Sequence, residues 1–394
     1  MADILGGLFD PTDSLAVQAG SGGLCPYRYP DGTDGWLITG NALAKSVLAD
    51  LRFSSRAEVK CVPVPRDGAE PFFGRPTLPG WFIDMDPPRH ATFRKRLAGY
   101  FTMHRLEARR TVIEQIVDEC LADVRGAGRP ADLIRHFAIP VPLRVIGALL
   151  GVPKEELPTL ETLSETLFSL ASSAAQSADA MDRLTDLFRD LVLHARSHPG
   201  GTDVLSTLSG ESEFSVEDLA GAAVLLLTAG HETTASMLGL STLHLLTRPG
   251  LDGGDLLAPE RVGDTVEELL RYLTILHLGV ARGATRDIEL AGQTIKAGEH
   301  VTVALPAANH DPGHFTDPKG FDPGRGPRGH IAFGYGVHQC IGQNLARLEL
   351  RIGLTRLFER FPGLGLAIDP RDVDFFRRGA VYGISSLPLT WSDE

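Results

Sequence analysis

Residues 333–342 read Phe333-Gly334-Tyr335-Gly336-Val337-His338-Gln339-Cys340-Ile341-Gly342. The three glycines favour a tight backbone turn that brings N–H groups toward the cysteine sulfur. The apolar spacing that follows predicts a helix over about 341–361, whose positive end would face the sulfur and lower the pKa of the thiol. A buried thiolate needs such donors, because without them it would be too basic and easily oxidised. The stretch therefore points to a cysteine that works as a thiolate.

A lone cysteine before a helix is more often a buried, inert small hydrophobe. Here, however, six residues match one fixed pattern, and the stretch resembles the haem-binding signature of the cytochrome P450 family. The resemblance implies that Cys340 is the axial ligand of a haem b iron, where a thiolate favours O–O cleavage. It also implies that Phe333 shields the sulfur from water, that Gly334 and Gly342 shape the cofactor loop, and that His338 reaches a haem propionate.

Two charged residues upstream are the next point of resemblance. Glu268 and Arg271 stand three apart in a helix expected over 263–273, so both lie on one helical face and can pair. By itself this spacing is equally typical of a solvated ion pair. The resemblance implies that Arg325 joins the pair and fixes the loop before the cysteine. Because Gly324 replaces an acidic residue that many relatives carry, Arg325 is expected to pair with Glu268 alone.

The most apolar predicted helix begins at a capping box, Ser215-Val-Glu-Asp, and ends near Leu246. A polar run, His231-Glu232-Thr233-Thr234, interrupts it. Polar groups on a buried helix are costly unless they form hydrogen bonds or take part in function. The run resembles the oxygen-activation motif of the family. The resemblance implies that Thr233 holds a hydrogen bond or water at the reacting oxygen, that Glu232 relays protons from solvent, and that Gly230 leaves room for dioxygen. Alternatively, the threonine hydroxyl bonds back onto the helix; it is also expected to disturb the helical hydrogen bonding.

Four basic residues resemble the haem-propionate ligands of the family: His90, Arg94, Arg282 and His338. His90 and Arg94 are four apart and would share one helical face. Propionates are carboxylates that enter a partly dry site, so cationic donors are their expected partners. Each residue alone would read as an ordinary surface charge.

The rest of the chain predicts more helix than strand. Apolar spacings of three and four predict helices over 111–124, 133–150, 160–170 and 181–193. Short strands are expected near 284–290 and 299–304. A hairpin is expected around Pro30-Asp31-Gly32, followed by a strand over Trp36–Thr39, and Asn41 is a candidate cap for the next short helix.

The resemblance covers about residues 27–391 and implies one domain over 1–394. Its fold would be mainly α with a small β region, a triangular prism in which haem lies between the long central helix and the helix after the cysteine loop. The net charge of −12 argues against general nucleic-acid binding. We expect no secretory signal and no membrane span, and four scattered cysteines fit a reducing cytoplasm. A monomer is expected.

By the same resemblance, substrate would bind beside the long helix and beside the segment after Arg271. The expected pocket residues are Leu225, Thr228, Ala229, His277, Leu278, Val280 and Ile384. Ala229 would also contact haem, whereas His277 is equally expected to be a structural histidine. An irregular loop over 62–88 would close the site with its part 64–85. Because this wall is largely apolar, we expect a bulky hydrophobic substrate, with a polyketide macrolide of secondary metabolism as the first choice.

The implied reaction inserts one atom of O2 into a C–H or C=C bond and releases the other as water. Two electrons would come from NAD(P)H through a ferredoxin reductase and a ferredoxin, because no dinucleotide motif or cysteine cluster is fused to the chain. An acidic ferredoxin would need a basic docking face. Its candidate residues, each equally readable as a solvated charge, are Arg89, Lys95, Arg96, Arg105, Arg109, Arg110 and Arg347.

Two alternatives to a monooxygenase keep the cysteine ligand. A peroxide-driven or nitric-oxide-reducing enzyme would not need the proton relay of Glu232 and Thr233. A haem sensor or carrier without catalysis would not need it either, so the presence of both residues favours the monooxygenase.

Overall fold

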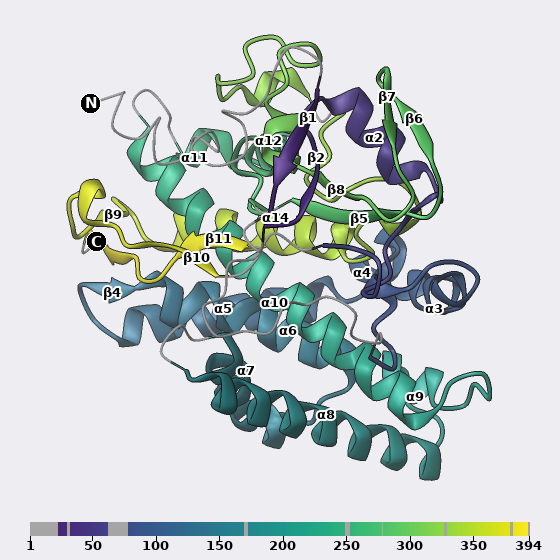
Figure 1. Ribbon diagram of the computed structural model, residues 1–394. Helices are drawn as coiled ribbons and strands as arrows, with labels where there is room; N and C mark the ends of the chain where they lie inside the picture. Colours follow the sequence, from purple (N-terminus) through teal and green to yellow (C-terminus); the bar gives the residue numbers. More distant parts are fainter. Residues whose placement is uncertain are drawn as a thin grey trace.

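Helices dominate the computed structural model, which describes residues 23–29, 32–61, 78–168, 172–248, 253–277, 279–326, 329–378 and 381–392. Figure 1 shows helix α10 crossing the middle of the molecule, with α7 and α8 below it and a β region above it. The α-helices are α2 (Asn41–Ala49), α3 (Arg89–Leu97), α4 (Met103–Glu107), α5 (Arg110–Gly126), α6 (Pro140–Leu150), α7 (Leu157–Phe168), α8 (Ala174–Ser197), α9 (Val204–Leu208), α10 (Val216–Thr247), α11 (Gly253–Leu256), α12 (Val262–Leu273), α13 (Leu305–Asn309) and α14 (Gln343–Arg360).

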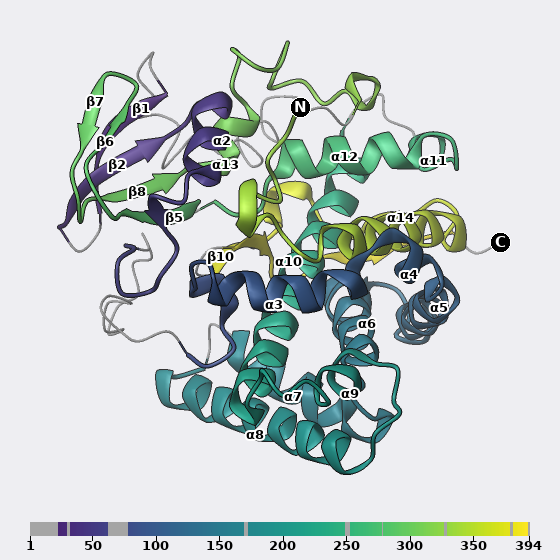
Figure 2. The same ribbon diagram turned by 90° about the vertical axis from the view of Figure 1, so that its right-hand side faces the viewer.

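The strands are short and gather in small sheets. They are β1 (Leu24–Arg28), β2 (Asp34–Ile38), β3 (Phe53–Ser54), β4 (Ala131–Asp132), β5 (Val280–Ala284), β6 (Ile288–Leu290), β7 (Gln293–Ile295), β8 (His300–Val303), β9 (Gly365–Leu366), β10 (Phe375–Arg378), β11 (Val381–Ile384) and β12 (Pro388–Thr390). The largest sheet has the order β1-β2-β8-β5-β3, in which β2 and β8 are parallel and the other neighbours are antiparallel. Figure 2 shows this sheet to one side of the helices.

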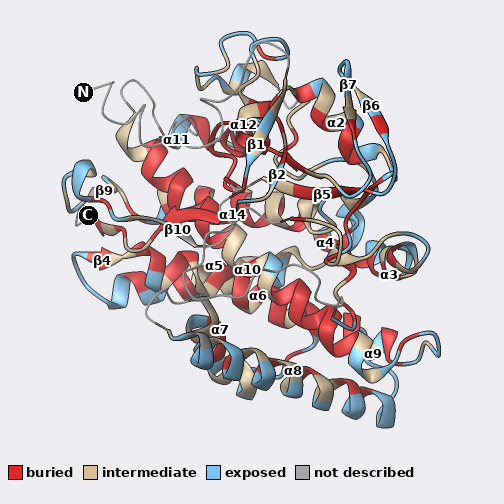
Figure 3. Cartoon of the chain, viewed as in Figure 1, coloured by how far each residue is buried: buried red, intermediate tan, exposed pale blue. Residues whose placement is uncertain are grey.

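Helix α10 is the central element because it is apolar on nearly every face. The expected capping box is confirmed: the Ser215 hydroxyl accepts from the Asp218 N–H at 3.0 Å, and the Asp218 carboxylate accepts from the Ser215 N–H at 3.2 Å. The helix packs against α6, α8, α14 and the strand β11. Figure 3 shows that these contacts bury most of its length, whereas the outer faces of α7 and α8 meet solvent. A helix that is buried all round forms the core of a large domain.

The cysteine loop lies between the β region and α14. Gly336 has a φ of +74°, and a Cβ atom there would lie 2.4 Å from the carbonyl oxygen of Leu48, so only glycine fits. Gly334 also has a positive φ, of +68°. Gly342 has a φ of −82°, yet it lies in the turn before α14 and its N–H is directed at the sulfur of Cys340, as expected.

The long α14 begins at Gln343 rather than directly after Cys340, and the expected cap of α2 is wrong. Asn41 is the first residue of that helix, and Gly40, which has no side chain, is at the cap. The carboxylate of Asp311 instead accepts from the N–H of Asn41 at 2.8 Å, so a residue far along the chain satisfies this helix end. The hairpin is confirmed by the pairing of β1 with β2, although Pro30 and Asp31 of its turn lie outside the described residues.

Two expected elements are divided in the structure. The helix expected over 133–150 consists of a π-helical turn, η4 (Ile134–Ala138), followed by α6. Pro140 begins α6 because proline has no N–H to continue the preceding hydrogen bonding. The single strand expected near 284–290 is likewise two strands, β5 and β6, that belong to different sheets.

The fold class, mainly α with a small β region, is confirmed. The main apolar core joins side chains of α5, α6, α8, α10 and α14. Within the described part of the chain, no helix is both long and apolar enough to span a bilayer.

Candidate functional site

A cavity of about 530 Å³ lies between α10 and the cysteine loop with α14. Its lining is mostly apolar, but a small group of polar and cationic side chains converges on it. The predicted site residues that line it are His90, Arg94, Leu225, Thr228, Ala229, Gly230, Glu232, Thr233, Val280, Arg282, Phe333, Gly334, His338, Cys340 and Gly342. The fold therefore brings together residues as far apart in the sequence as His90 and Gly342.

Two predicted pocket residues do not line this cavity. The ring of His277 is stacked on that of Tyr382, with 4.3 Å between the ring centroids and 15° between the ring planes. His277 therefore packs as a structural histidine and does not line the cavity. Ile384 is buried in β11, where it pairs with Phe375 of β10. Leu278 lies outside the described residues.

The loop expected to close the pocket is described only from residue 78 onward. Within that part, Phe82 and Ile83 line the cavity, and half of the Ile83 side chain is exposed. Residues 64–77 of this prediction lie outside the described residues.

Cys340 is exposed to the cavity, and charged and polar groups lie close to it. Burial raises the pKa of its thiol. The backbone N–H groups of Gly342 and Gln343, at the start of α14, donate to the sulfur and lower that pKa, and the cations Arg94 and Arg347 act in the same direction. The backbone N–H of Cys340 itself donates to the carbonyl oxygen of Phe333 at 2.9 Å. These donors fit a metal-bound thiolate.

The cationic side chains form one cluster beside the cysteine loop. The rings of His90 and His338 are 3.9 Å apart between centroids, and Arg94 and Arg282 lie close enough to act on both. Burial, followed by Arg282, His90, Arg94 and Lys60, lowers the pKa of His338 to about 2, and burial lowers that of Arg282 to about 10. The charges of Arg94 and Arg282 in a partly dry site call for an anion, to which the neutral imidazoles of His90 and His338 can donate hydrogen bonds. Two carboxylates entering from the cavity would neutralise these charges.

The polar run of α10 faces this cavity without breaking the helix. The hydroxyl of Thr233 donates to the carbonyl oxygen of Ala229 at 2.7 Å, and α10 continues through the run. The expected local disturbance is therefore not observed, although the hydroxyl oxygen keeps its lone pairs for a partner in the cavity. Gly230 lines the cavity, and a Cβ there would make an ordinary van der Waals contact with Ile146, at 3.8 Å.

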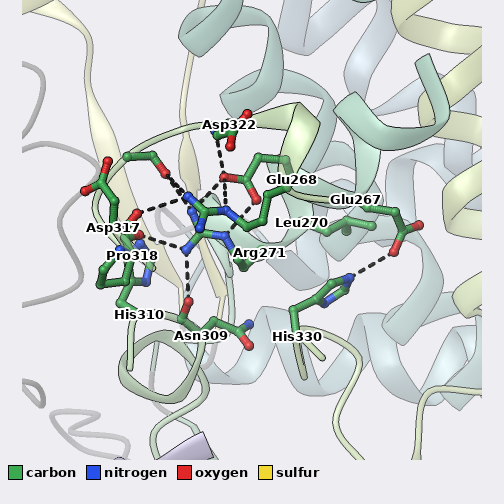
Figure 4. Close-up of polar contacts among 12 residues, drawn as sticks. Glu267, Glu268, Leu270, Arg271, Asn309, His310, Asp317, Pro318, Asp322 and His330 are labelled. Atoms are coloured by element: carbon green, nitrogen blue, oxygen red, sulfur yellow. Dashed lines mark hydrogen bonds and ion pairs between the residues drawn. The ribbon is translucent and has the colours of Figure 1, made fainter. Parts of the chain in front are cut away.

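The ion pair predicted on α12 is buried. Glu268 accepts from Nε and Nη2 of Arg271, both at 2.8 Å, and the two side chains are 4% and 2% exposed. Arg271 also donates to the carbonyl oxygens of Asn309, Pro318 and Gly320 at 2.8–2.9 Å (Figure 4). One guanidinium thus holds α12, α13 and the loop before the cysteine together.

Arg325 joins this group as expected. Its Nε lies 3.3 Å from Glu268, which is the carboxylate it pairs with in the described part of the chain. The guanidinium also donates to the carbonyl oxygens of Thr316, Asp317 and Gly320. These backbone contacts hold the guanidinium of Arg325 in addition to its pairing with Glu268.

Sequence reasoning missed three residues that the structure places at the site. Asn309 accepts from the N–H of Ile331 at 2.7 Å and donates to the hydroxyl of Thr274 at 2.8 Å, which ties the start of the cysteine loop to the end of α12. Lys60, paired with Asp84, lines the cavity beside the cationic cluster. Glu349 of α14 lines it too, in a helix stretch that reads as ordinary. None carries a sequence signal, because each depends on a tertiary contact.

Because Glu349 is buried, the free energy of unfolding should depend measurably on pH. Its side chain is 2% exposed, its Oε2 atom has no hydrogen-bond partner among the described residues, and burial raises its pKa from 4.5 to about 8. The folded state therefore keeps a proton that the unfolded chain loses above pH 4.5. The free energy of unfolding should fall as pH rises from about 4.5 to about 8, by up to about 1.4 kcal/mol per pH unit.

Denaturant unfolding at pH 5 and pH 8 measures this effect. Glu349→Gln should remove most of the loss at pH 8, whereas the exposed Glu359→Gln on the same helix should leave it unchanged. An identical pH dependence in wild type and Glu349→Gln would contradict the assignment.

Comparisons with known proteins agree on one family. A family model described as "Cytochrome P450" matches residues 262–364. "Cytochrome P450-SU2" of Streptomyces griseolus is 39% identical over 97% of this chain and 94% of its own length. "Pentalenic acid synthase" of Streptomyces avermitilis is 38% identical over 92% of this chain and 89% of its own.

Solved structures of related proteins have the same fold as this chain. CYP105P1 in complex with filipin I superposes with a TM-score of 0.88 at 39% identity, over 98% of this chain and 96% of that one. The mycinamicin VIII C21 methyl hydroxylase of Micromonospora griseorubida, bound to mycinamicin VIII, gives a TM-score of 0.84 at 34% identity, over 95% of both chains.

Proposed function

The chain belongs to the cytochrome P450 family of monooxygenases, and from that premise we propose that it oxidises a bulky, mostly hydrophobic natural product with one atom of O2. The single observation that carries the proposal is the cavity wall. The polar run of α10, with Glu232 and Thr233, lines the same cavity as Cys340. A haem-thiolate site that activates oxygen combines a thiolate, which favours O–O cleavage, with a group that delivers protons.

Family membership implies a haem whose iron is bound by a cysteine thiolate. The residues present fit such a group: Cys340 would hold the iron, and the cluster of His90, Arg94, Arg282 and His338 would hold the propionates. When bound, the haem supplies dioxygen activation, by which one oxygen atom enters a C–H or C=C bond and the other leaves as water.

The side chains of α10 then have separate tasks. Thr233 would accept a hydrogen bond from a water or a protonated group in the cavity. Its oxygen can accept because its own hydroxyl proton is donated to the carbonyl oxygen of Ala229. Glu232 would carry protons toward Thr233 from solvent. Gly230 would keep the adjacent space open for a small ligand such as O2.

The Thr233→Ala variant tests this function. Product formed per NAD(P)H consumed should fall steeply, since a positioned group in a proton-transfer path is worth on the order of 10²-fold or more. The electrons that no longer reach product should appear as hydrogen peroxide. Product analysis under ¹⁸O2, together with peroxide assays, measures both quantities.

The matched control is Thr242→Ala. That hydroxyl also bonds back onto α10, to Leu238 at 2.8 Å, but it does not line the cavity. If wild type forms no product and Thr233→Ala behaves like wild type, the sensor or carrier alternative would be favoured. Turnover with peroxide or nitric oxide alone would favour the other enzymes considered above.

For the substrate we propose the macrolide and polyketide class. Apolar residues contribute most of the cavity lining, among them Leu225, Leu226, Met237 and Ile83. Related structures named in complex with filipin I and mycinamicin VIII support this class. A library of such compounds, screened by the change of the ferric spin state on binding, would identify the substrate.

For the electron donor we propose a ferredoxin with its reductase. Several arginines considered for its docking face are engaged within the chain: Arg89 pairs with Asp218, Arg96 with Glu211 and Glu213, and Arg110 with Glu107. Lys95 and Arg105 are exposed and make no ion pair among the described residues, although Arg105 stacks over Tyr100. They are therefore the better candidates.

Reversing both charges, in a Lys95→Glu and Arg105→Glu variant, should slow reduction by an acidic ferredoxin about tenfold at low salt while haem content stays normal. Stopped-flow reduction measures this rate. Arg183→Glu on the distant α8 is the control, and an unchanged rate in the double variant would remove these two residues from the docking face.

A further inference from the structure

A second buried carboxylate lies next to the one that pairs with Arg271. Glu267 of α12 is 7% exposed and receives three hydrogen bonds: from Nε and Nη2 of Arg347 at 2.5 and 3.0 Å, and from Nε2 of His330 at 2.9 Å. Figure 4 shows Glu267 with His330, on the side of α12 away from Arg271. Burial acts to raise the pKa of Glu267, but these donors hold it at about 2. The carboxylate is therefore a fixed negative charge.

This carboxylate orients a cation toward the cysteine loop. Arg347 lies in α14, and its Nη1 also donates to the side chain of Gln343 at 3.0 Å. Its guanidinium carbon stands 4.6 Å from the centre of the Phe333 ring. Since Arg347 is held on two sides and only 20% exposed, it is poorly placed to dock a partner protein.

The positive charge of Arg347 acts on the thiol of Cys340. Arg347 stacks on Phe333, whose carbonyl oxygen accepts the N–H of Cys340 at 2.9 Å, and the positive charges of Arg94 and Arg347 both favour the thiolate form of Cys340. They differ in their surroundings: Arg94 belongs to the cationic cluster beside the propionate site, whereas Arg347 is bidentate to Glu267. Such a clamp fixes both the distance and the direction of the charge.

We propose that Arg347, clamped by Glu267 and stacked on Phe333, is a positioning residue that sets how strongly the Cys340 thiolate donates to the haem iron. The proposal rests on Cys340 being the iron ligand. A fixed positive charge near the sulfur stabilises the reduced, more negative state of the iron–thiolate unit relative to the oxidised one. The negative charge of Glu267 weakens that effect. Glu267 contacts Arg347, and Arg347 in turn contacts Phe333 of the cysteine loop, so Glu267 is the more remote of the two charges.

Two single substitutions should therefore shift the reduction equilibrium in opposite directions. Arg347→Gln removes the positive charge and should favour the ferric state by up to about tenfold, which is about 59 mV for a one-electron couple. Glu267→Gln removes the negative charge and should favour the ferrous state. The double variant should return toward wild type, and Arg347→Lys, which keeps the charge without the bidentate clamp, should lie between wild type and Arg347→Gln.

Spectroelectrochemical titration of the purified, substrate-free holoprotein measures these equilibria. The control is Arg356→Gln, which removes an arginine of the same helix that pairs with Glu114 and Asp118, and it should leave the equilibrium unchanged. Equal potentials in wild type and Arg347→Gln, or shifts of the same sign in both single variants, would overturn the proposal. Failure of the haem–thiolate assignment itself would instead show in the wild type, whose reduced carbonyl adduct would lack a thiolate spectrum. If Arg347→Gln does not retain haem, Glu267→Gln and Arg347→Lys carry the test, because both keep the cation.

Discussion

Replacing Cys340 by serine should abolish the strongly red-shifted absorption band that the reduced carbonyl adduct of a haem–thiolate protein shows. A serine hydroxyl stays protonated in the surroundings that favour a thiolate, because its pKa is far higher, so the iron loses its electron-rich ligand. The sulfur also accepts the N–H groups of Gly342 and Gln343, which a neutral hydroxyl would use less well. Absorption spectra of the reduced protein with and without carbon monoxide measure the band.

The matched control is Cys25→Ser. Cys25 is a half-buried cysteine in β1 whose thiol donates to the carbonyl oxygen of Leu37, and it does not line the cavity. Its replacement should leave the band intact. Survival of the band in Cys340→Ser would assign the ligand to another residue and remove the basis of the proposed site.

The cysteine loop could be predicted from sequence because its chemistry is local. Gly334 and Gly336 adopt the positive φ angles that their residue type permits, and the start of α14 follows within three residues of Cys340. The capping box of α10 is local for the same reason. An equivalent box at Ser173 and Gln176 begins α8, seven residues before the apolar spacing suggested, so that signal was present in the sequence.

Other features of the site depend on partners that are distant in the sequence. The N–H of Asn41 is satisfied by Asp311, and nothing near either residue indicates the contact. Glu349 reads as an ordinary charged helix residue until the packing of α14 buries it. Glu267 and Glu268 are adjacent in the sequence, yet Glu268 pairs with Arg271 whereas Glu267 pairs with Arg347. Family resemblance supplies some of these contacts, but residue patterns alone do not.

Replacing Arg271 by methionine should destabilise the protein by about 3–5 kcal/mol, because it leaves the carboxylate of Glu268 buried without its main partner. It also removes the donors to the carbonyl oxygens of Asn309, Pro318 and Gly320, which hold the loop before the cysteine. We therefore expect haem to be lost together with stability. Denaturant unfolding and haem content per chain measure both effects.

The chain offers a control with the same residue types and spacing. Glu107 and Arg110 are also three apart, and Nε of Arg110 lies 2.6 Å from Glu107, but their side chains are 44% and 42% exposed. Water solvates that carboxylate when its partner is removed, so Arg110→Met should cost about 0–1 kcal/mol. Because the two pairs differ mainly in burial, the difference between the variants measures what desolvation adds. Equal losses in both would mean that Arg271 does not stabilise a buried charge, and that the loop before Cys340 is held in place by other contacts.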